Sequence, residues 1–398
     1  MTAPSNHSIN AEIYNLGPAL FDAVRQAVLE QATVDRQKEL HERNKYVLQK
    51  RIEEVLRGAM PSTATLNANA MWQAIWPRIV YAGTRAGKAS SEITSMRELV
   101  PWFRDLHNFH PEEYKFDDGE WAQWRKMDAK MRPEPQGHFF KTTPKVWKLL
   151  TKDRQTFPDL RFSAWDTKVK KYIAVSNLLW PDLARPGMNS LHRYTGGLTF
   201  TAEHKTGIDW VKERQELAKV QQRFESSLGK LTALHTMMDI GLKTIKPDRV
   251  MTRLFSELGW LITLPRGTSR QELEKVYLRE AVVEEMTVRA DVLAKALVDA
   301  GLLVERGQAH RLLDIWFVKY GQEPEPDYGI TLNLSSEQPI ASLLERIKSR
   351  VPELIENRIT AQDAASLWPW PNEFKPVRKQ ANSASGFRLA PSRRKKTT

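Results

Sequence analysis

The stretch of residues 228–259 constrains the fold most, because glycines and a proline divide it into two short helices. It reads LGKLTALHTMMDIGLKTIKPDRVMTRLFSELG. A turn at Gly229 opens an apolar helix over residues 233–240, and Gly241 ends this helix. The start of a helix leaves backbone N–H groups without partners, and such groups suit a phosphate oxygen. The turn at residues 228–232 is therefore a candidate phosphate-binding hairpin.

The second helix of this stretch begins at Asp248. Pro247 disfavours helix at Lys246, so the chain approaches the helix in an extended conformation. Apolar residues then recur at helical spacing, at Val250, Met251, Leu254, Phe255 and Leu258. This pattern places Asp248 at the N-cap or in the first turn. We expect the two helix starts to lie close together, one offering N–H groups and the other a carboxylate.

Together these residues resemble the helix-hairpin-helix DNA glycosylases. The hairpin of that family is similar to Leu228-Gly229-Lys230-Leu231-Thr232-Ala233, and its catalytic aspartate falls at a similar distance, at Asp248. An arginine that follows the aspartate by five residues in the family corresponds to Arg253. The resemblance covers residues 215–325 at most. It implies an all-α fold with a two-lobed helical core and helical insertions.

The resemblance also implies an activity. In the family the aspartate, here Asp248, stabilises an oxocarbenium-like sugar and positions the water that displaces the base. Bifunctional members carry a nucleophilic lysine where this chain has Leu231, so the likeness implies a monofunctional enzyme that leaves an abasic site. The implied partner is double-stranded DNA, held through residues 228–232 and Arg253, and we expect no cofactor. The identity of the base, and the choice between repair and defence against foreign DNA, stay open.

The residues alone allow two other classes of function. An aspartate after a proline is an ordinary helix cap, and a glycine before Thr-Ala is an ordinary turn. A non-catalytic helical protein could use the hairpin only to grip DNA phosphates, or could serve in assembly. A nucleoside or nucleotide N-glycosidase could use the same fold without a basic DNA-binding face.

The whole chain is predicted to be mainly helical, with at most a short strand or two, and to divide into four parts. Residues 1–60 form an N-terminal helical arm, for which a helix packed on the core is the alternative. Residues 61–330 form the core, with a Trp-, Lys- and Pro-rich insertion at about 110–197. Residues 331–373 form a C-terminal helical segment, and residues 374–398 a basic disordered tail.

Several element boundaries follow from the pattern of apolar residues and glycines. Residues 270–300 read as two helices divided after Met286, with Gly301 as the C-cap, and a further apolar helix ends at Gly321. In a glycosylase this last helix would pack beside the helix begun by Asp248. Asp314 on it is then either a partner near the site or a surface or capping acid. The sequence GITLNLSS, which follows Tyr328, is a possible short strand.

The net charge of +12 is concentrated at the C-terminus. Eight of the 60 Lys and Arg residues lie between Lys375 and Lys396, a segment without Asp or Glu, so 52 basic residues face 48 acidic ones elsewhere. A tail of this kind adds non-specific, salt-dependent affinity for nucleic acid, or is a solvated terminus without a partner. The glycine-containing loop 81–88 offers Arg85 and Lys88 as further candidate DNA contacts, with an ordinary interhelix loop as the alternative.

Composition excludes several kinds of site. The chain has no cysteine, so it can form neither disulfides nor thiolate-bound zinc or iron–sulfur clusters. Its nine histidines are scattered, and we expect no metal site. No apolar run is long enough to span a membrane, and the N-terminus does not resemble a secretory signal. We therefore expect a cytoplasmic, nucleoid-associated protein with no membrane partner.

Overall fold

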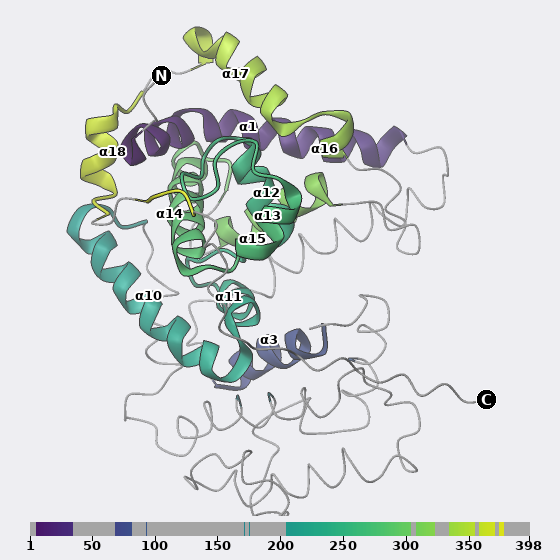
Figure 1. Ribbon diagram of the computed structural model, residues 1–398, viewed down its shortest axis with the longest axis vertical. Helices are drawn as coiled ribbons and strands as arrows, with labels where there is room; N and C mark the ends of the chain where they lie inside the picture. Colours follow the sequence, from purple (N-terminus) through teal and green to yellow (C-terminus); the bar gives the residue numbers. More distant parts are fainter. Residues whose placement is uncertain are drawn as a thin grey trace, which may run out of the picture.

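The computed structural model describes residues 5–34, 68–81, 93, 171, 175, 204–303, 308–322, 334–354, 358–370 and 374–377. Within these ranges the regular elements are all α-helices and no strand occurs (Figure 1). This part of the protein is therefore all-α, as the sequence predicts. Most of the region expected to be an insertion, residues 110–197, lies outside the described residues.

Eleven helices are described within these ranges. They are α1 (Asn6–Val34), α3 (Ala68–Tyr81), α10 (Gly207–Leu228), α11 (Lys230–Asp239), α12 (Arg249–Glu257), α13 (Arg270–Val276), α14 (Glu280–Asp299), α15 (Gln308–Gly321), α16 (Leu334–Glu337), α17 (Ile340–Leu354) and α18 (Ala361–Leu367).

Helix α1 lies across the helices of the core and packs most extensively on α14, with α15, α17 and α18 also against it (Figure 1). Its apolar residues at spacings of three and four are buried, namely Ile13, Leu16, Leu20, Val24 and Val28. Gly17 lies at the contact with α14, where an added Cβ would come within 2.3 Å of Leu293 Cδ1. The described part of the expected N-terminal arm is thus a packed helix of the core, which was the alternative interpretation.

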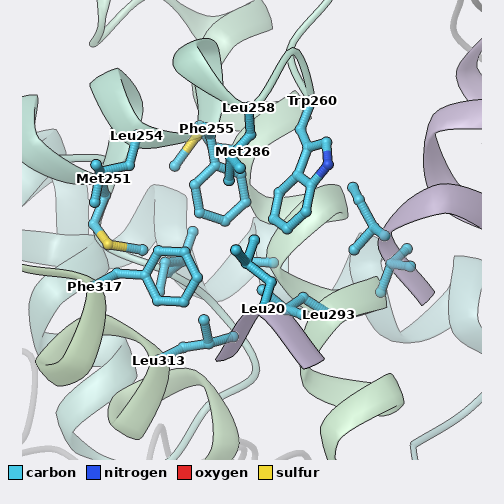
Figure 2. Close-up of a cluster of buried hydrophobic side chains, with 14 of the residues drawn as sticks. Leu20, Met251, Leu254, Phe255, Leu258, Trp260, Met286, Leu293, Leu313 and Phe317 are labelled. Atoms are coloured by element: carbon cyan, nitrogen blue, oxygen red, sulfur yellow. The ribbon is translucent and has the colours of Figure 1, made fainter. Parts of the chain in front are cut away.

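The centre of the core is formed by α12, α14 and α15 (Figure 2). Phe255 packs edge-on against Trp260 with ring centroids 5.4 Å apart. The ring centroid of Phe317, from α15, lies 6.1 Å from that of Phe255. Met286 and Leu293 bring α14 into the same cluster. The apolar stripe predicted for the helix after Asp248 is therefore what attaches α12 to the rest of the molecule.

One ion pair is sealed within this core. Glu285 and Arg289, one turn apart on α14, are both 0% exposed and lie 2.8 Å apart. Glu285 also accepts hydrogen bonds from the backbone N–H groups of Ile262 and Thr263, and Arg289 donates to the Trp260 carbonyl oxygen. The pair thereby fixes the segment that follows α12 onto α14.

The predicted break after Met286 is wrong. Glu285 and Arg289, which flank that position, belong to one continuous helix and pair with each other inside the core. The break lies earlier, between Val276 and Glu280, where Arg279 N donates to Val276 O. Helix α14 is then continuous to Asp299, and Gly301 follows it with a positive φ of 68°.

The C-terminal part joins the same core. Helices α16, α17 and α18 contribute Leu334, Leu344 and Ala364 to it. The end of the possible strand GITLNLSS is helical, because α16 begins at Leu334, and its first five residues lie outside the described residues. Residues 374–377, expected to begin a disordered tail, are packed: Phe374 is buried and Val377 N donates to Thr263 O. The remaining tail lies outside the described residues.

None of the helices in the described ranges is long and apolar enough to cross a membrane.

Candidate functional site

The hairpin is a turn of one residue between two helices. Gly229 separates α10 from α11 with φ 76° and ψ 156°, a conformation essentially confined to glycine. Its N–H donates to Glu225 O, and its carbonyl oxygen accepts from Ala233 N. Helix α11 therefore begins at Lys230, three residues earlier than predicted.

The first backbone N–H groups of α11 have no acceptor within the helix. The donor of the first intrahelical hydrogen bond is Ala233 N, so the N–H groups of Lys230, Leu231 and Thr232 come before it. Leu228 is buried, whereas Gly229 is exposed. The buried leucine anchors the turn and leaves its backbone accessible to an anion.

Asp248 is the N-cap of α12, as predicted. Its Oδ1 accepts from Met251 N at 2.9 Å, and its φ of −75° and ψ of 175° are extended. The side chain keeps 21% of its surface exposed. Asp248 is thus oriented by the helix start and still reachable from solvent.

The second oxygen of Asp248 faces Lys246. Lys246 Nζ lies 2.9 Å from Asp248 Oδ2 and 3.7 Å from Oδ1 of Asp314 on α15. Asp314 is buried, with a side chain only 5% exposed, and its other oxygen accepts from Arg311 at 3.0 Å. The interpretation of Asp314 as a surface acid is therefore wrong, because Asp314 is buried next to Lys246, which also contacts Asp248.

Arg311 continues this series of ion pairs to α11 and α3. Its Nε lies 3.1 Å from Oδ1 of Asp239, the last residue of α11. Asp239 in turn pairs with Arg78 of α3 and lies 3.7 Å from His235 Nε2. We call the series Arg78, Asp239, Arg311, Asp314, Lys246 and Asp248 the charged chain.

Burial and neighbouring charges shift the pKa of two groups in the charged chain. Burial raises the pKa of Asp314, against the opposing effect of Lys246 and Arg311. Burial alone would lower the pKa of Lys246, but the carboxylates of Asp314 and Asp248 outweigh it and raise that pKa. Lys246 is therefore held as a cation and is unsuited to act as a neutral amine nucleophile.

The hairpin and Asp248 lie toward opposite ends of α11. The hairpin precedes the first residue of α11, whereas Asp239 at its last residue leads through the charged chain to Asp248. A helix of 10 residues is about 15 Å long. The expectation that the two helix starts lie close together is therefore wrong, because α11 separates them.

Arg253, an expected DNA contact, is engaged within the protein. Its guanidinium donates to Gly321 O and, at 3.3 Å, to Ser335 Oγ, and lies 3.6 Å from Glu257. These contacts join α12 to the end of α15 and the start of α16. The other two expected contacts, Arg85 and Lys88, lie outside the described residues.

A cavity of about 480 Å³ lies between α10, α11 and α14, next to the hairpin. Its lining mixes apolar side chains with both signs of charge. The lining residues are Arg214, Leu217, Ala218, Gln221, Gln222, Glu225, Lys230, Met237, Thr244, Glu280, Val283, Glu284, Thr287, Val288 and Trp370. Asp248 is not among them, so this cavity is not a pocket for a base presented to that carboxylate.

A second polar group, which sequence reasoning missed, surrounds Asp291 in the interior. Asp291 accepts from Trp210 Nε1 and lies 3.2 Å from His310 Nε2, 3.9 Å from Arg214 and 4.0 Å from His204. We call these five residues the Asp291 cluster. They come from separate parts of the sequence, which gives no local signal for such a cluster.

The pKa shifts in the Asp291 cluster show how its charges are arranged. Burial opposes ionisation of Asp291, but the neighbouring Arg214 and His310 hold its pKa well below the usual range. Burial lowers the pKa of His204 to about 3 and also lowers that of His310. Both imidazoles are thus neutral near pH 7. In the described part of the chain, no three His, Asp or Glu side chains are placed to hold a metal ion.

Comparison with protein-family models, with characterised proteins and with solved structures finds no match to this chain.

Proposed function

We propose that the protein is a monofunctional DNA glycosylase that binds duplex DNA through the Gly229 hairpin and hydrolyses an N-glycosidic bond with the Asp248 carboxylate. The observation that carries the proposal is the setting of Asp248. It is partly exposed at a helix start, with one oxygen fixed by Met251 N and the other by Lys246.

A carboxylate in this setting suits a reaction in which positive charge develops on a sugar. Opposite unit charges about 4 Å apart attract by about 4 kcal/mol near a protein surface, which corresponds to roughly a thousandfold in rate. Lys246 is shared between Asp248 and Asp314, so it neutralises Asp248 only in part. Asp248 would stabilise the oxocarbenium-like sugar and orient the attacking water.

The hairpin and the carboxylate would contact different nucleotides. Helix α11 alone is about 15 Å long, which corresponds to roughly four nucleotides of a duplex at about 3.4 Å each. The N–H groups at the start of α11 would hold a phosphate while a nucleotide farther along the strand is turned out toward Asp248. We propose further that two lobes of the helical core enclose that nucleotide.

The test of catalysis is abasic-site formation on duplexes that carry alkylated, oxidised, deaminated or otherwise modified bases. We expect Asp248→Asn to lose at least about 100-fold in excision rate and to keep its affinity for DNA. Asparagine is also a good N-cap, so the fold should persist. Ser269→Ala removes the cap of α13 and serves as the control that should excise normally. Excision by Asp248→Asn at the wild-type rate would refute the catalytic role.

The test of the hairpin compares two glycines with positive φ and open space around their missing Cβ, Gly229 and Gly259. Alanine strains the backbone in both cases, but only Gly229→Ala should weaken salt-dependent binding to duplex DNA. Equal affinity of the two variants would contradict a role of the hairpin in binding.

A non-catalytic DNA-binding or assembly protein is the second candidate. It is favoured by the absence of Asp248 from the lining of the cavity beside the hairpin. This candidate predicts DNA binding that depends on Gly229, without abasic sites on any modified duplex.

A further inference from the structure

We propose that Asp314 is a positioning residue for Asp248, acting through Lys246. Asp314 holds the ammonium group of Lys246, and Lys246 holds the outer oxygen of Asp248. The contact itself is independent of any activity, while its consequence for catalysis depends on the function proposed above.

The geometry gives Asp248 two fixed points. Met251 N binds Oδ1 at 2.9 Å, and Lys246 Nζ lies 2.9 Å from Oδ2. The first contact belongs to α12 itself. The second depends on where a flexible lysine side chain is held, because Lys246 lies in the segment before α12.

Asp314 is suited to hold that lysine. Its Oδ2 accepts from Arg311 Nη1 at 3.0 Å, which leaves Oδ1 facing Lys246 Nζ at 3.7 Å. Helix α15 packs beside α12, so the position of Asp314 is rigid with respect to Asp248. The second contact of Arg311, to Asp239, fixes the guanidinium in turn.

Asp314 cannot itself contact a substrate, because only 5% of its side chain is exposed. The charged groups that face it are Lys246, Arg311, Asp248 and Asp239. Removal of its charge would free Lys246 to pair with Asp248 alone or to turn toward solvent. In either case the orientation and the net charge of the Asp248 site change.

The catalytic test uses Asp314→Asn in the full-length protein, with a modified duplex that the wild type cleaves. A misplacement of about 1 Å can cost about 100-fold in rate, so we expect kcat to fall by about 100-fold with the DNA dissociation constant unchanged. Lys246→Met should have a similar effect. Since both act through one contact, the double variant should be no slower than Lys246→Met alone.

Glu285→Gln provides the matched control for loss of a buried, paired carboxylate. It should lower stability while the folded protein keeps its kcat. An unchanged kcat in Asp314→Asn, or multiplicative effects in the double variant, would overturn the positioning role. If Asp314→Asn does not fold, Asp314→Glu decides, because it keeps a buried carboxylate near Arg311 but displaces it relative to Lys246; an unchanged kcat in this variant would also overturn the positioning role.

A crystal structure of Asp314→Asn gives the readout that does not require activity. We expect Lys246 to leave its present position and Asp248 to occupy more than one rotamer. An unmoved Lys246–Asp248 pair would overturn the inference even if excision is established. A displaced pair in a protein that forms no abasic sites would refute the proposed function and leave the positioning contact standing.

Discussion

Asp248 has one observed role, as a helix cap, and one proposed role, in catalysis, and single substitutions separate the two. As an N-cap it needs a side-chain oxygen that accepts from Met251 N. As a proposed catalytic carboxylate it needs a negative charge. Asparagine supplies the first without the second, and alanine supplies neither.

We predict that Asp248→Ala lowers the free energy of unfolding by about 1 kcal/mol, through loss of the cap. Asp248→Asn should stay within about 0.5 kcal/mol of the wild type, because asparagine caps helices as well as aspartate does. Urea titration followed by circular dichroism measures both. Equal destabilisation by the two variants would show that the charge, rather than the cap, stabilises this helix start.

The buried ion pair between Arg289 and Glu285 stabilises the fold. Arg289→Met leaves the Glu285 carboxylate buried without its cation, and we predict a loss of about 3–5 kcal/mol in unfolding free energy. Lys219→Met, which breaks the exposed pair with Glu216, should cost at most about 1 kcal/mol in the same denaturation experiment. A small effect of Arg289→Met would mean that Glu285 is satisfied by its backbone donors alone.

At the scale of elements, the contact between α1 and α14 depends on the missing side chain of Gly17. Alanine ordinarily has the higher helix propensity by about 1 kcal/mol, but Pro18 follows this position and disfavours a helical residue with a Cβ before it. The local conformation and the 2.3 Å approach to Leu293 therefore both oppose Gly17→Ala.

We predict that Gly17→Ala lowers the free energy of unfolding by about 1–3 kcal/mol, because the added methyl group overpacks the interface. In a Leu293→Ala background the same substitution should cost less, since the space next to position 17 is then open. Thermal unfolding of the wild type, Gly17→Ala, Leu293→Ala and the double variant measures the effect of the added methyl group in both backgrounds. A stabilising effect of Gly17→Ala in the wild-type background would show that α1 shifts at little cost.

At the scale of the molecule, the Asp291 cluster joins three helices that come from distant parts of the chain. Trp210 and Arg214 belong to α10, Asp291 to α14 and His310 to α15. Its histidines are buried in the neutral form, which links the folded state of this part of the protein to pH.

We predict that acid destabilises the protein through these histidines. Their pKa values are lower in the folded protein than the ordinary 6.5, that of His204 being about 3. The unfolded chain therefore binds more protons, and the free energy of unfolding falls as pH drops below about 6.5. Two such groups give a slope of at most about 2.7 kcal/mol per pH unit.

Urea unfolding between pH 7.5 and 5 measures this slope. The ordinary pKa of an aspartate is 3.8, so stability that depends on ionised Asp291 is lost mainly below this window. The double variant His204→Gln/His310→Gln should flatten the profile above pH 5. An equally steep profile in that variant would place the pH dependence elsewhere in the molecule.

The sequence by itself determined the features set by local steric and capping chemistry. Gly229 and Gly241 ended helices where a positive φ was needed, Pro247 and Asp248 set the start of α12, and the apolar spacing in α1 marked its buried face. These features depend on residues within one or two turns of each other, so the sequence pattern is sufficient to predict them.

The tertiary structure alone decided which polar side chains meet. The charged chain brings Asp239, Asp314 and Lys246 to Asp248, and the Asp291 cluster brings His204 to His310; each set spans several helices. The break before Glu280 and the packing of residues 374–377 likewise depended on what lay opposite in space. The physical reason is that a buried charge is tolerated only beside its partner, and that partner is chosen by the packing of helices rather than by neighbours along the chain.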